Sequence, residues 1–323
     1  MIYFKSYEKS YFIVKVVLLF SLITLLGCER RYPGVSTITL PQIEIGEDNI
    51  TYIDGEPFFP IGMAHVYKWG GFSFLAPDYD TFDEIFSDIR DGGFNVVHTY
   101  QSNHYDSRFP EFLRKAEQYG LKVVIPPTTN NEHVTNLVKD VSHDMNASAL
   151  LSWYLVDEPA GVGISPAVVK RYHDIVKKVD PFHLTSMVLA NPFKYADYMN
   201  VSDVFMIDSY PIWEYANYRV TQVSDYVDAA LDAMQTIGVS KPLWVVLQAF
   251  GYQDDDNRAW GWDREPTYEE ERCMTYLAIV HGAKGIFYYC FGSPGVPGGG
   301  GKSYFIPNSP QHWQDLKSIA REL

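Results

Sequence analysis

The sequence predicts a single α/β domain folded as a (β/α)8 TIM barrel. Eight short apolar runs of β type alternate along the chain with eight stretches whose apolar residues recur at helical spacing. This alternation is typical of repeated βα units that build a parallel sheet. The length of 323 residues also suits the fold, because such barrels commonly take about 250 residues as one domain.

The predicted strands are rich in aliphatic and aromatic residues. The fourth is the most informative, because the run from Leu151 to Val156 is apolar on both faces and is followed by Asp157, Glu158 and Pro159. A run without polar alternation is typical of a parallel strand that is buried on both sides. The eight expected strands are 59–65, 95–100, 122–126, 151–158, 185–190, 204–210, 243–250 and 285–291.

The stretches between these runs predict helices. The first carries Phe82, Ile85, Phe86 and Ile89 at helical spacing and ends at a pair of glycines. Thr267 and Glu270 have the spacing of a capping box, which assigns Glu270 a structural role. The expected helices are 80–91, 110–119, 133–141, 165–179, a short one at 194–199, 218–237, 268–281 and 310–323.

The first 49 residues are expected to precede the barrel domain, which we place at residues 50–323. Three lysines precede the apolar run from Val16 to Leu26, as in an export signal, and the run is too short to span a bilayer. The quartet that ends in Cys28 resembles the lipobox of bacterial lipoproteins, which implies cleavage before Cys28 and lipidation of its thiol. Residues 1–28 are therefore expected to form a lipoprotein signal peptide and residues 29–49 a tether.

The lipobox resemblance implies an exported protein that is anchored to a bacterial membrane through Cys28. Glu29 follows the cysteine, which favours the outer membrane or cell surface over the inner membrane. Within the domain, an Asp54-Gly55 turn between two β-type runs predicts a small hairpin before the barrel, where it is expected to close the barrel floor.

Composition limits the partners. The formal net charge of −14 and the lack of a basic cluster argue against nucleic acid or an anionic polymer. Aromatic residues make up 15% of the chain, and several tryptophans fall in polar stretches where a core does not explain them. Aromatic faces in a cleft suit the apolar faces of sugars, so a neutral oligo- or polysaccharide is the expected partner. These tryptophans are Trp69, Trp213, Trp260 and Trp262.

No metal or cofactor is implied. Cys273 and Cys290 have no metal-site spacing; they are expected to be small buried hydrophobes, although a disulfide between them stays open. The segment Gly301-Lys302-Ser303 lacks the preceding glycine of a phosphate-binding loop, since Val296 occupies that position.

Polar residues at the carboxyl ends of different strands are the candidate site. In a TIM barrel these ends converge on one pocket. Side-chain alternation would turn Glu158 toward the barrel axis and make Asp157 its outer neighbour. Acids, amides and phenols without a nucleophilic serine, phosphate loop or metal cluster support water-mediated cleavage by paired carboxylates. The set comprises His65, His98, Tyr100, Asp157, Glu158, Asp208, Tyr210, Gln248 and either Tyr288, which we favour, or Tyr289, together with Trp213, Trp260 and Trp262 on loops.

Four segments in order resemble the barrels of clan A glycoside hydrolases over about residues 50–323. The resemblance implies hydrolysis of glycosidic bonds, with Glu158 in the place of the acid/base glutamate at the end of the fourth strand. In the place of the nucleophilic glutamate that ends the seventh strand, this chain has Gln248, and an amide is neither a nucleophile nor a base. The segments are 54–59, 93–97, 119–123 and 153–159.

The Gln248 departure leaves several mechanisms open. Asp208 can be the base of an inverting pair, because the ends of the fourth and sixth strands should lie roughly 9 Å apart, within the ~6.5–9.5 Å of such pairs. Alternatively, an acetamido group of the substrate attacks, or the loop 252–267 supplies the acid. The remaining possibility is a catalytically inactive surface lipoprotein that binds carbohydrate. His65 and His98 can equally be hydrogen-bonded pocket or core residues.

Overall fold

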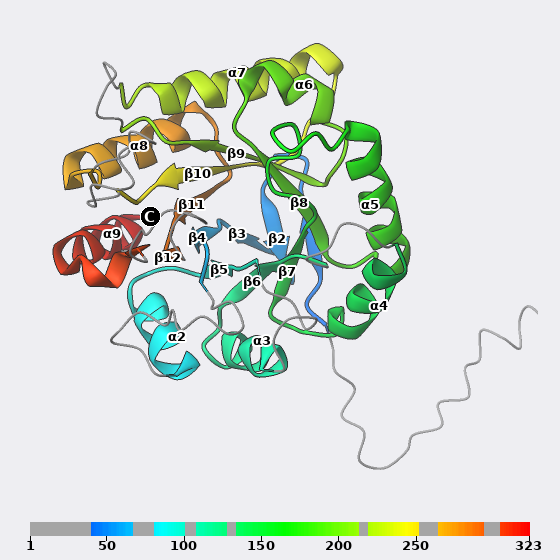
Figure 1. The fold of residues 1–323 in the computed structure, drawn as a ribbon, viewed down its shortest axis with the longest axis horizontal. Coiled ribbons are helices and arrows are strands. Elements are labelled where there is room, and N and C mark those ends of the chain that lie inside the picture. The colour runs from blue at the N-terminus through cyan, green and yellow to red at the C-terminus, as the bar shows by residue number, and fades with distance from the viewer. Residues whose placement is uncertain are drawn as a thin grey trace, which may run out of the picture. The chain divides into compact units, whose positions relative to one another are not determined.

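The computed structural model describes residues 40–66, 81–100, 108–127, 134–212, 219–251, 264–293 and 304–323. In this part of the chain, eight parallel strands close into a barrel in the order β10-β11-β4-β5-β6-β7-β8-β9 (Figure 1). All eight predicted strands are confirmed, and the fourth ends at Tyr154, four residues earlier than expected. The barrel strands are β4 (Ile61–Met63), β5 (Val96–His98), β6 (Lys122–Ile125), β7 (Leu150–Tyr154), β8 (Leu184–Leu189), β9 (Val204–Ser209), β10 (Leu243–Gln248) and β11 (Gly285–Tyr289).

Each barrel strand is followed by a helix, and together they form a (β/α)8 barrel with the helices outside the strands (Figure 1). The short helix after β8 consists of a 3-10 turn, η1 (Pro192–Lys194), and α6 (Tyr195–Tyr198). The other helices are α2 (Phe82–Asp91), α3 (Phe109–Gln118), α4 (Val134–Asp144), α5 (Pro166–Val179), α7 (Gln222–Ile237), α8 (Tyr268–His281) and α9 (Pro310–Glu322). A small β12 (Gly292–Ser293) and β13 (Tyr304–Phe305) pair and a 3-10 turn, η3 (Ile306–Asn308), lie between β11 and α9.

Local sequence explains where several helices begin and end. The capping box predicted for Thr267 and Glu270 is present at the start of α8, and a second one, Thr81 with Glu84, begins α2. In each, side chain and backbone satisfy two amide donors that the first helical turn leaves without partners. Helix α7 ends at Gly238, whose φ of 70° is unfavourable for residues with a Cβ atom.

The barrel interior is filled by large side chains that pack against glycines. A Cβ atom on Gly62 of β4 would lie 2.2 Å from the ring of Phe287, and one on Gly285 of β11 would lie 2.7 Å from Trp244. Trp244 and Phe287 are fully buried and belong to the apolar cluster of the interior. The interior is therefore a packed core.

The N-terminal part of the domain is a three-stranded antiparallel sheet of β1 (Ile43–Ile45), β2 (Thr51–Ile53) and β3 (Glu56–Phe58). The predicted Asp54-Gly55 hairpin is confirmed, and both turn residues have positive φ values, 54° and 82°. Ile43 belongs to the apolar cluster of the barrel interior, so the sheet covers the barrel floor as expected. Because β1 lies within residues 29–49, the folded unit, which starts at Leu40, extends further toward the N-terminus than the predicted boundary.

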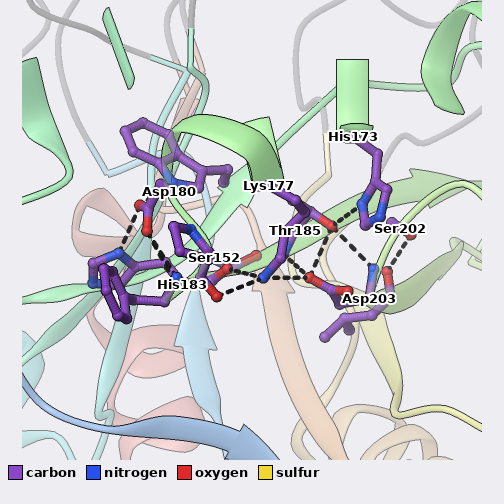
Figure 2. A network of polar contacts seen from close by, with 12 residues as sticks. Ser152, His173, Lys177, Asp180, His183, Thr185, Ser202 and Asp203 are labelled. Carbon is purple, nitrogen blue, oxygen red and sulfur yellow. Dashed lines mark hydrogen bonds and ion pairs between the residues drawn. The ribbon is translucent and has the colours of Figure 1, made fainter. Parts of the chain in front are cut away.

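A polar network joins α5 to the amino-terminal ends of β8 and β9 (Figure 2). The fully buried carboxylate of Asp180 accepts hydrogen bonds from Trp153 Nε1 at 2.8 Å and from His183 Nδ1 at 2.7 Å. Asp203 accepts from the Thr185 amide at 3.0 Å and lies 3.4 Å from Lys177 Nζ. These side chains bond to one another and to nearby backbone groups at the strand starts, so their role is structural.

Both cysteines in the described residues are free thiols, which excludes a bond between them in this structure. Cys290 is buried as expected, whereas Cys273 is exposed on α8, because the helix turns this position away from the barrel. No helix in the described part of the chain is long and apolar enough to cross a membrane. Cys28 lies outside the described residues.

Candidate active site

A pocket opens at the carboxyl ends of the barrel strands. Its floor is apolar and is formed by interior residues of β8 to β11. Its wall is polar and aromatic, with side chains at or just after the ends of β5, β7, β9 and β11. The lining residues are Ala64, His98, Tyr100, Tyr154, Asp157, Val188, Met206, Asp208, Tyr210, Val246, Phe287 and Tyr289.

The end of β7 turns Asp157 and Glu158 toward different strands. Because β7 stops at Tyr154, strict alternation does not continue to these residues, and Glu158 adopts a left-handed backbone with φ 43°. Asp157 bonds to Tyr100, which follows β5, while Glu158 accepts a hydrogen bond from the backbone of Ala190, which follows β8. The expectation that Asp157 faces outward is therefore wrong: it lines the pocket wall.

Left-handed backbone at non-glycine residues recurs at this pocket. His65, directly after β4, has φ 61°. Such conformations cost about 1–3 kcal/mol each and persist where the surrounding structure requires them, often at functional sites. Glu158 and His65 therefore carry backbone strain at the mouth of the barrel.

Glu158 and Asp208 form a carboxyl pair linked by a side-chain hydrogen bond. One oxygen of each group, Glu158 Oε1 and Asp208 Oδ1, is buried and has no donor among the described residues. Two carboxyl groups in contact cannot both ionise readily, so a proton on one of them stabilises the pair. The pair therefore holds a shared proton in the neutral pH range.

The surroundings of the two carboxyl groups favour the proton on Glu158 over Asp208. Burial, followed by the negative charge of Asp208, raises the pKa of Glu158 to about 9. Burial raises the pKa of Asp208 to about 6, and hydrogen bonds from Glu158 and Tyr210 limit the rise. Since the two groups titrate together, these values describe the pair, with Glu158 as its acid member and Asp208 as its charged member.

The contact corrects the separation expected from strand spacing. The ends of β7 and β9 are separated by β8, but the side chains of Glu158 and Asp208 lean toward each other until they share a hydrogen bond. A water molecule does not fit between groups in contact, so the pair lacks the ~6.5–9.5 Å gap of an inverting pair and the ~5–5.5 Å gap of a retaining one.

Asp157 is held by two tyrosines. Its Oδ1 accepts hydrogen bonds from Tyr154 Oη at 2.6 Å and from Tyr100 Oη at 3.2 Å. Burial raises the pKa of Asp157, while these two phenols oppose the rise by stabilising the anion. Tyr154, the last residue of β7, is thus a pocket residue that orients this carboxylate.

His65 and His98 are buried neutral imidazoles. Burial lowers the pKa of His65 to about 4 and, together with the nearby His65, that of His98 to about 3. The ring of His98 packs against Tyr100 and Tyr154 at centroid distances of 4.7 and 4.5 Å. Among the described residues, no group bonds to His98 Nε2 or His65 Nδ1, and both nitrogens are buried.

Gln248 is not a pocket-lining residue. It is fully buried, its Oε1 accepts from the Ile212 amide at 2.9 Å, and its Nε2 donates to the carbonyls of Phe250 and Ile212 at 3.1 and 3.3 Å. The amide therefore ties the chain after β9 to the chain after β10. This arrangement differs from the predicted contact with substrate, because backbone groups already use both ends of the amide.

Tyr289 lines the pocket in place of Tyr288, the residue favoured from the sequence. Tyr288 points to the helices, where its hydroxyl lies 2.9 Å from Thr275 Oγ1 on α8. Tyr289 lines the pocket and packs against Tyr210 and Phe250 at centroid distances of 5.8 and 5.7 Å. The alternation along β11 allows only one of two neighbouring tyrosines to face the interior, and the choice of Tyr288 was wrong.

The structure thus brings together six predicted residues: His65, His98, Tyr100, Asp157, Glu158 and Asp208, with Tyr210 beside them. Trp213, Trp260 and Trp262 lie outside the described residues. In the described ranges, no group of three or more His, Cys, Asp or Glu side chains is placed to hold a metal ion.

Several solved structures with a similar fold are glycosidases. A GH2 β-galacturonidase from Eisenbergiella tayi bound to galacturonate matches with a TM-score of 0.62 and 15% identity, covering 88% of this chain and 54% of that one. A β-D-glucuronidase from Dictyoglomus thermophilum gives the same values. Bacteroides uniformis β-glucuronidase 2 matches with a TM-score of 0.56 and 11% identity, over 78% of this chain and 32% of that one.

These matches show that the chain has the barrel fold found in glycoside hydrolases. It spans about half the length of the first two neighbours. Neither the protein-family models nor the curated protein sequences contain a match to this chain.

Proposed function

We propose that the protein hydrolyses glycosidic bonds of a neutral glycan, with Glu158 as the general acid. The observation that carries this proposal is the Glu158–Asp208 pair, which holds one proton at neutral pH at the working end of a barrel of glycosidase type. A general acid must still be protonated near the working pH, and a raised pKa is how carboxyl groups meet that condition.

In this proposal, Glu158 protonates the oxygen of the leaving group. Asp208 lines the pocket, and we assign it a positioning role: its charge keeps the proton on Glu158, and Tyr210 stabilises that charge. This role replaces that of a base acting through a water molecule, because the two carboxyl groups are in contact.

The pocket chemistry favours a neutral sugar. Asp157, Glu158 and Asp208 supply three carboxyl groups around one pocket, and its lining residues in the described ranges include no lysine or arginine. A carboxylate on the substrate would be repelled there. The rings of Tyr210 and Tyr289 offer apolar faces of the kind that sugars pack on.

Carbohydrate binding without cleavage is the second candidate. The observation that favours it is Gln248, since the place of a nucleophile on β10 holds an amide bonded to backbone groups. In that case the neutral imidazoles and tyrosines would bind hydroxyl groups, and the carboxyl pair would only orient the ligand.

The two candidates are separated by a panel of 4-nitrophenyl α- and β-glycosides and neutral polysaccharides, with product release and binding measured together. Glu158→Gln should keep the fold and ligand binding and lose on the order of 10²–10⁴-fold in rate on substrates whose leaving group needs a proton. Wild-type rates in the variant would exclude Glu158 as the acid, and binding without release by the unmodified protein would favour the second candidate.

We also propose that the protein is exported and anchored through Cys28. The support is the lipobox-like quartet at 25–28 behind an apolar run. The unmodified protein should partition with membranes and the Cys28→Ala variant should not; equal partition of both would contradict the anchor.

A further inference from the structure

We infer that Asp157 is the second catalytic carboxylate, the base that activates the attacking water from the side of the pocket opposite Glu158. This inference rests on the proposed glycosidase function. It assigns the residue that the proposed acid needs as its counterpart and that neither Asp208 nor Gln248 provides.

The first support is the divergence of two adjacent side chains. Asp157 bonds to the tyrosines on the β5 and β7 side of the pocket, while Glu158 contacts Asp208 and the Ala190 backbone on the β8 and β9 side. The two carboxyl groups are therefore held by different partners on different sides of the pocket, Asp157 by phenols and Glu158 by Asp208. A glycosidic bond can therefore lie between them with a water molecule on the Asp157 side.

The second support is the way Asp157 is held. Both tyrosines donate to the same oxygen, Oδ1, so the ring hydroxyls fix the orientation of the carboxylate. Oδ2 makes no hydrogen bond with the described residues, and Asp157 keeps an exposed edge although it lies against the pocket wall. A fixed carboxylate with one open oxygen is what a general base requires.

The third support is the exclusion of the other described carboxylates. Asp208 is 9% exposed, and its contact with Glu158 places it on the acid side. Gln248 carries no charge, and its amide is bound to the backbone. Among the described pocket residues, this leaves Asp157 as the carboxylate on the opposite side.

The step balances with water as the second reactant. Asp157 Oδ2 takes a proton from the water molecule as its oxygen bonds to the anomeric carbon, and the bond from that carbon to the leaving oxygen breaks. The leaving oxygen takes the proton of Glu158. Asp157 then returns its proton to solvent and the Glu158–Asp208 pair regains one, so the net reaction adds one water across the glycosidic bond.

The test uses the full chain and the 4-nitrophenyl glycoside that it cleaves fastest in the panel. Asp157→Asn should keep the melting temperature within a few degrees and lower kcat by on the order of 10²–10⁴-fold. Asp157→Ala should regain part of its activity with sodium azide and release a glycosyl azide of inverted configuration. NMR of the first product of the unmodified protein should show inversion. Asp197→Asn, the same substitution on the exposed surface of α6, is the matched control and should leave the rate unchanged.

The outcomes separate this inference from the proposed function. If Glu158→Gln is inactive while Asp157→Asn turns over at the wild-type rate, Asp157 is not the base and the glycosidase proposal stands. A retained product also overturns the assignment, including retention confined to 2-acetamido sugars, which would make Asp157 an orienting residue for the substrate. Lack of turnover of every glycoside by the unmodified protein would overturn both.

Discussion

Replacing Asp208 by asparagine tests the central pair, because it removes a charge next to Glu158 and keeps the shape of the side chain. At about 4 Å and an effective dielectric constant of about 20, two unit charges interact by about 4 kcal/mol. That energy would lower the pKa of Glu158 by up to about 3, since one pKa unit corresponds to about 1.4 kcal/mol. Glu158 is partly exposed and burial raises its pKa independently, so we expect a fall of roughly 1–3 from the value of about 9.

The consequence is a pH-dependent loss of activity. In the unmodified protein the alkaline limb of kcat/KM should lie near pH 9, where the pair loses its shared proton. In Asp208→Asn the limb should move to roughly pH 6–8, so the rate at pH 8 falls by about twofold for a limb near pH 8 and about 100-fold for a limb near pH 6, and it stays within a few-fold of wild type at pH 5 to 6.

The assay is a pH profile of kcat/KM on the same aryl glycoside. A carboxyl titration of the ligand-free protein by ¹³C NMR measures the pKa of Glu158 without turnover. If Asp208→Asn is inactive at every pH while the pKa of Glu158 is unchanged, Asp208 acts directly on the reaction and the reasoning fails. An unchanged profile would remove Asp208 from the site altogether.

Three further predictions concern the pocket and the core. Tyr154→Phe removes the 2.6 Å hydrogen bond that stabilises the Asp157 anion, so the pKa of Asp157 should rise. The acid limb of the kcat/KM profile should then move up by about 1 pH unit. An unmoved limb would exclude Asp157 as the group that titrates there. Glu271 on α8 is fully buried with no partner for either carboxyl oxygen in the described residues, and burial raises its pKa well above the usual range. It therefore stays neutral in the folded protein but ionises in the unfolded chain above about pH 4.3, so its effect lowers stability as pH rises. Glu271→Leu should raise the free energy of unfolding by at least about 1 kcal/mol at pH 8 and by less at pH 5, and an equal effect at both pH values would contradict the account. Gly62→Ala places a methyl group against the Phe287 ring and should lower the free energy of unfolding, measured with denaturant, by about 1–3 kcal/mol. Adding Phe287→Leu should recover part of this loss. An unchanged free energy of unfolding in Gly62→Ala would show that the side chains of the interior can rearrange around the methyl group.

Most of the fold follows from local patterns in the sequence. The eight strands and their helices appear as runs of two different periods, and a parallel sheet follows from their alternation. The capping box at Thr267 and the hairpin at Asp54-Gly55 depend on residues within a few positions of each other. Such features are visible in sequence because short-range contacts determine them.

The sequence also located the pocket. The carboxyl ends of parallel strands meet on one face of a barrel, so polar residues at His98, Glu158 and Asp208 could be assigned to one site from their positions alone. It did not determine which of two neighbouring residues faces that site. Tyr288 and Tyr289 have the same chemistry, and only the register of β11 against its neighbours selects Tyr289.

Only the tertiary structure decided how the carboxyl groups are arranged. Alternation predicts direction only while a strand continues, and β7 ends before Asp157 and Glu158. Beyond that point the backbone follows the packing of its neighbours, which gives Glu158 a left-handed conformation and turns its side chain to Asp208 on β9. Strand spacing gives the distance between backbones, whereas the separation of two acids depends on how far their side chains lean. The sequence therefore determined that the strand ends carry acids, and the closure of the barrel decided that Glu158 pairs with Asp208 and that Asp157 bonds to Tyr100 and Tyr154.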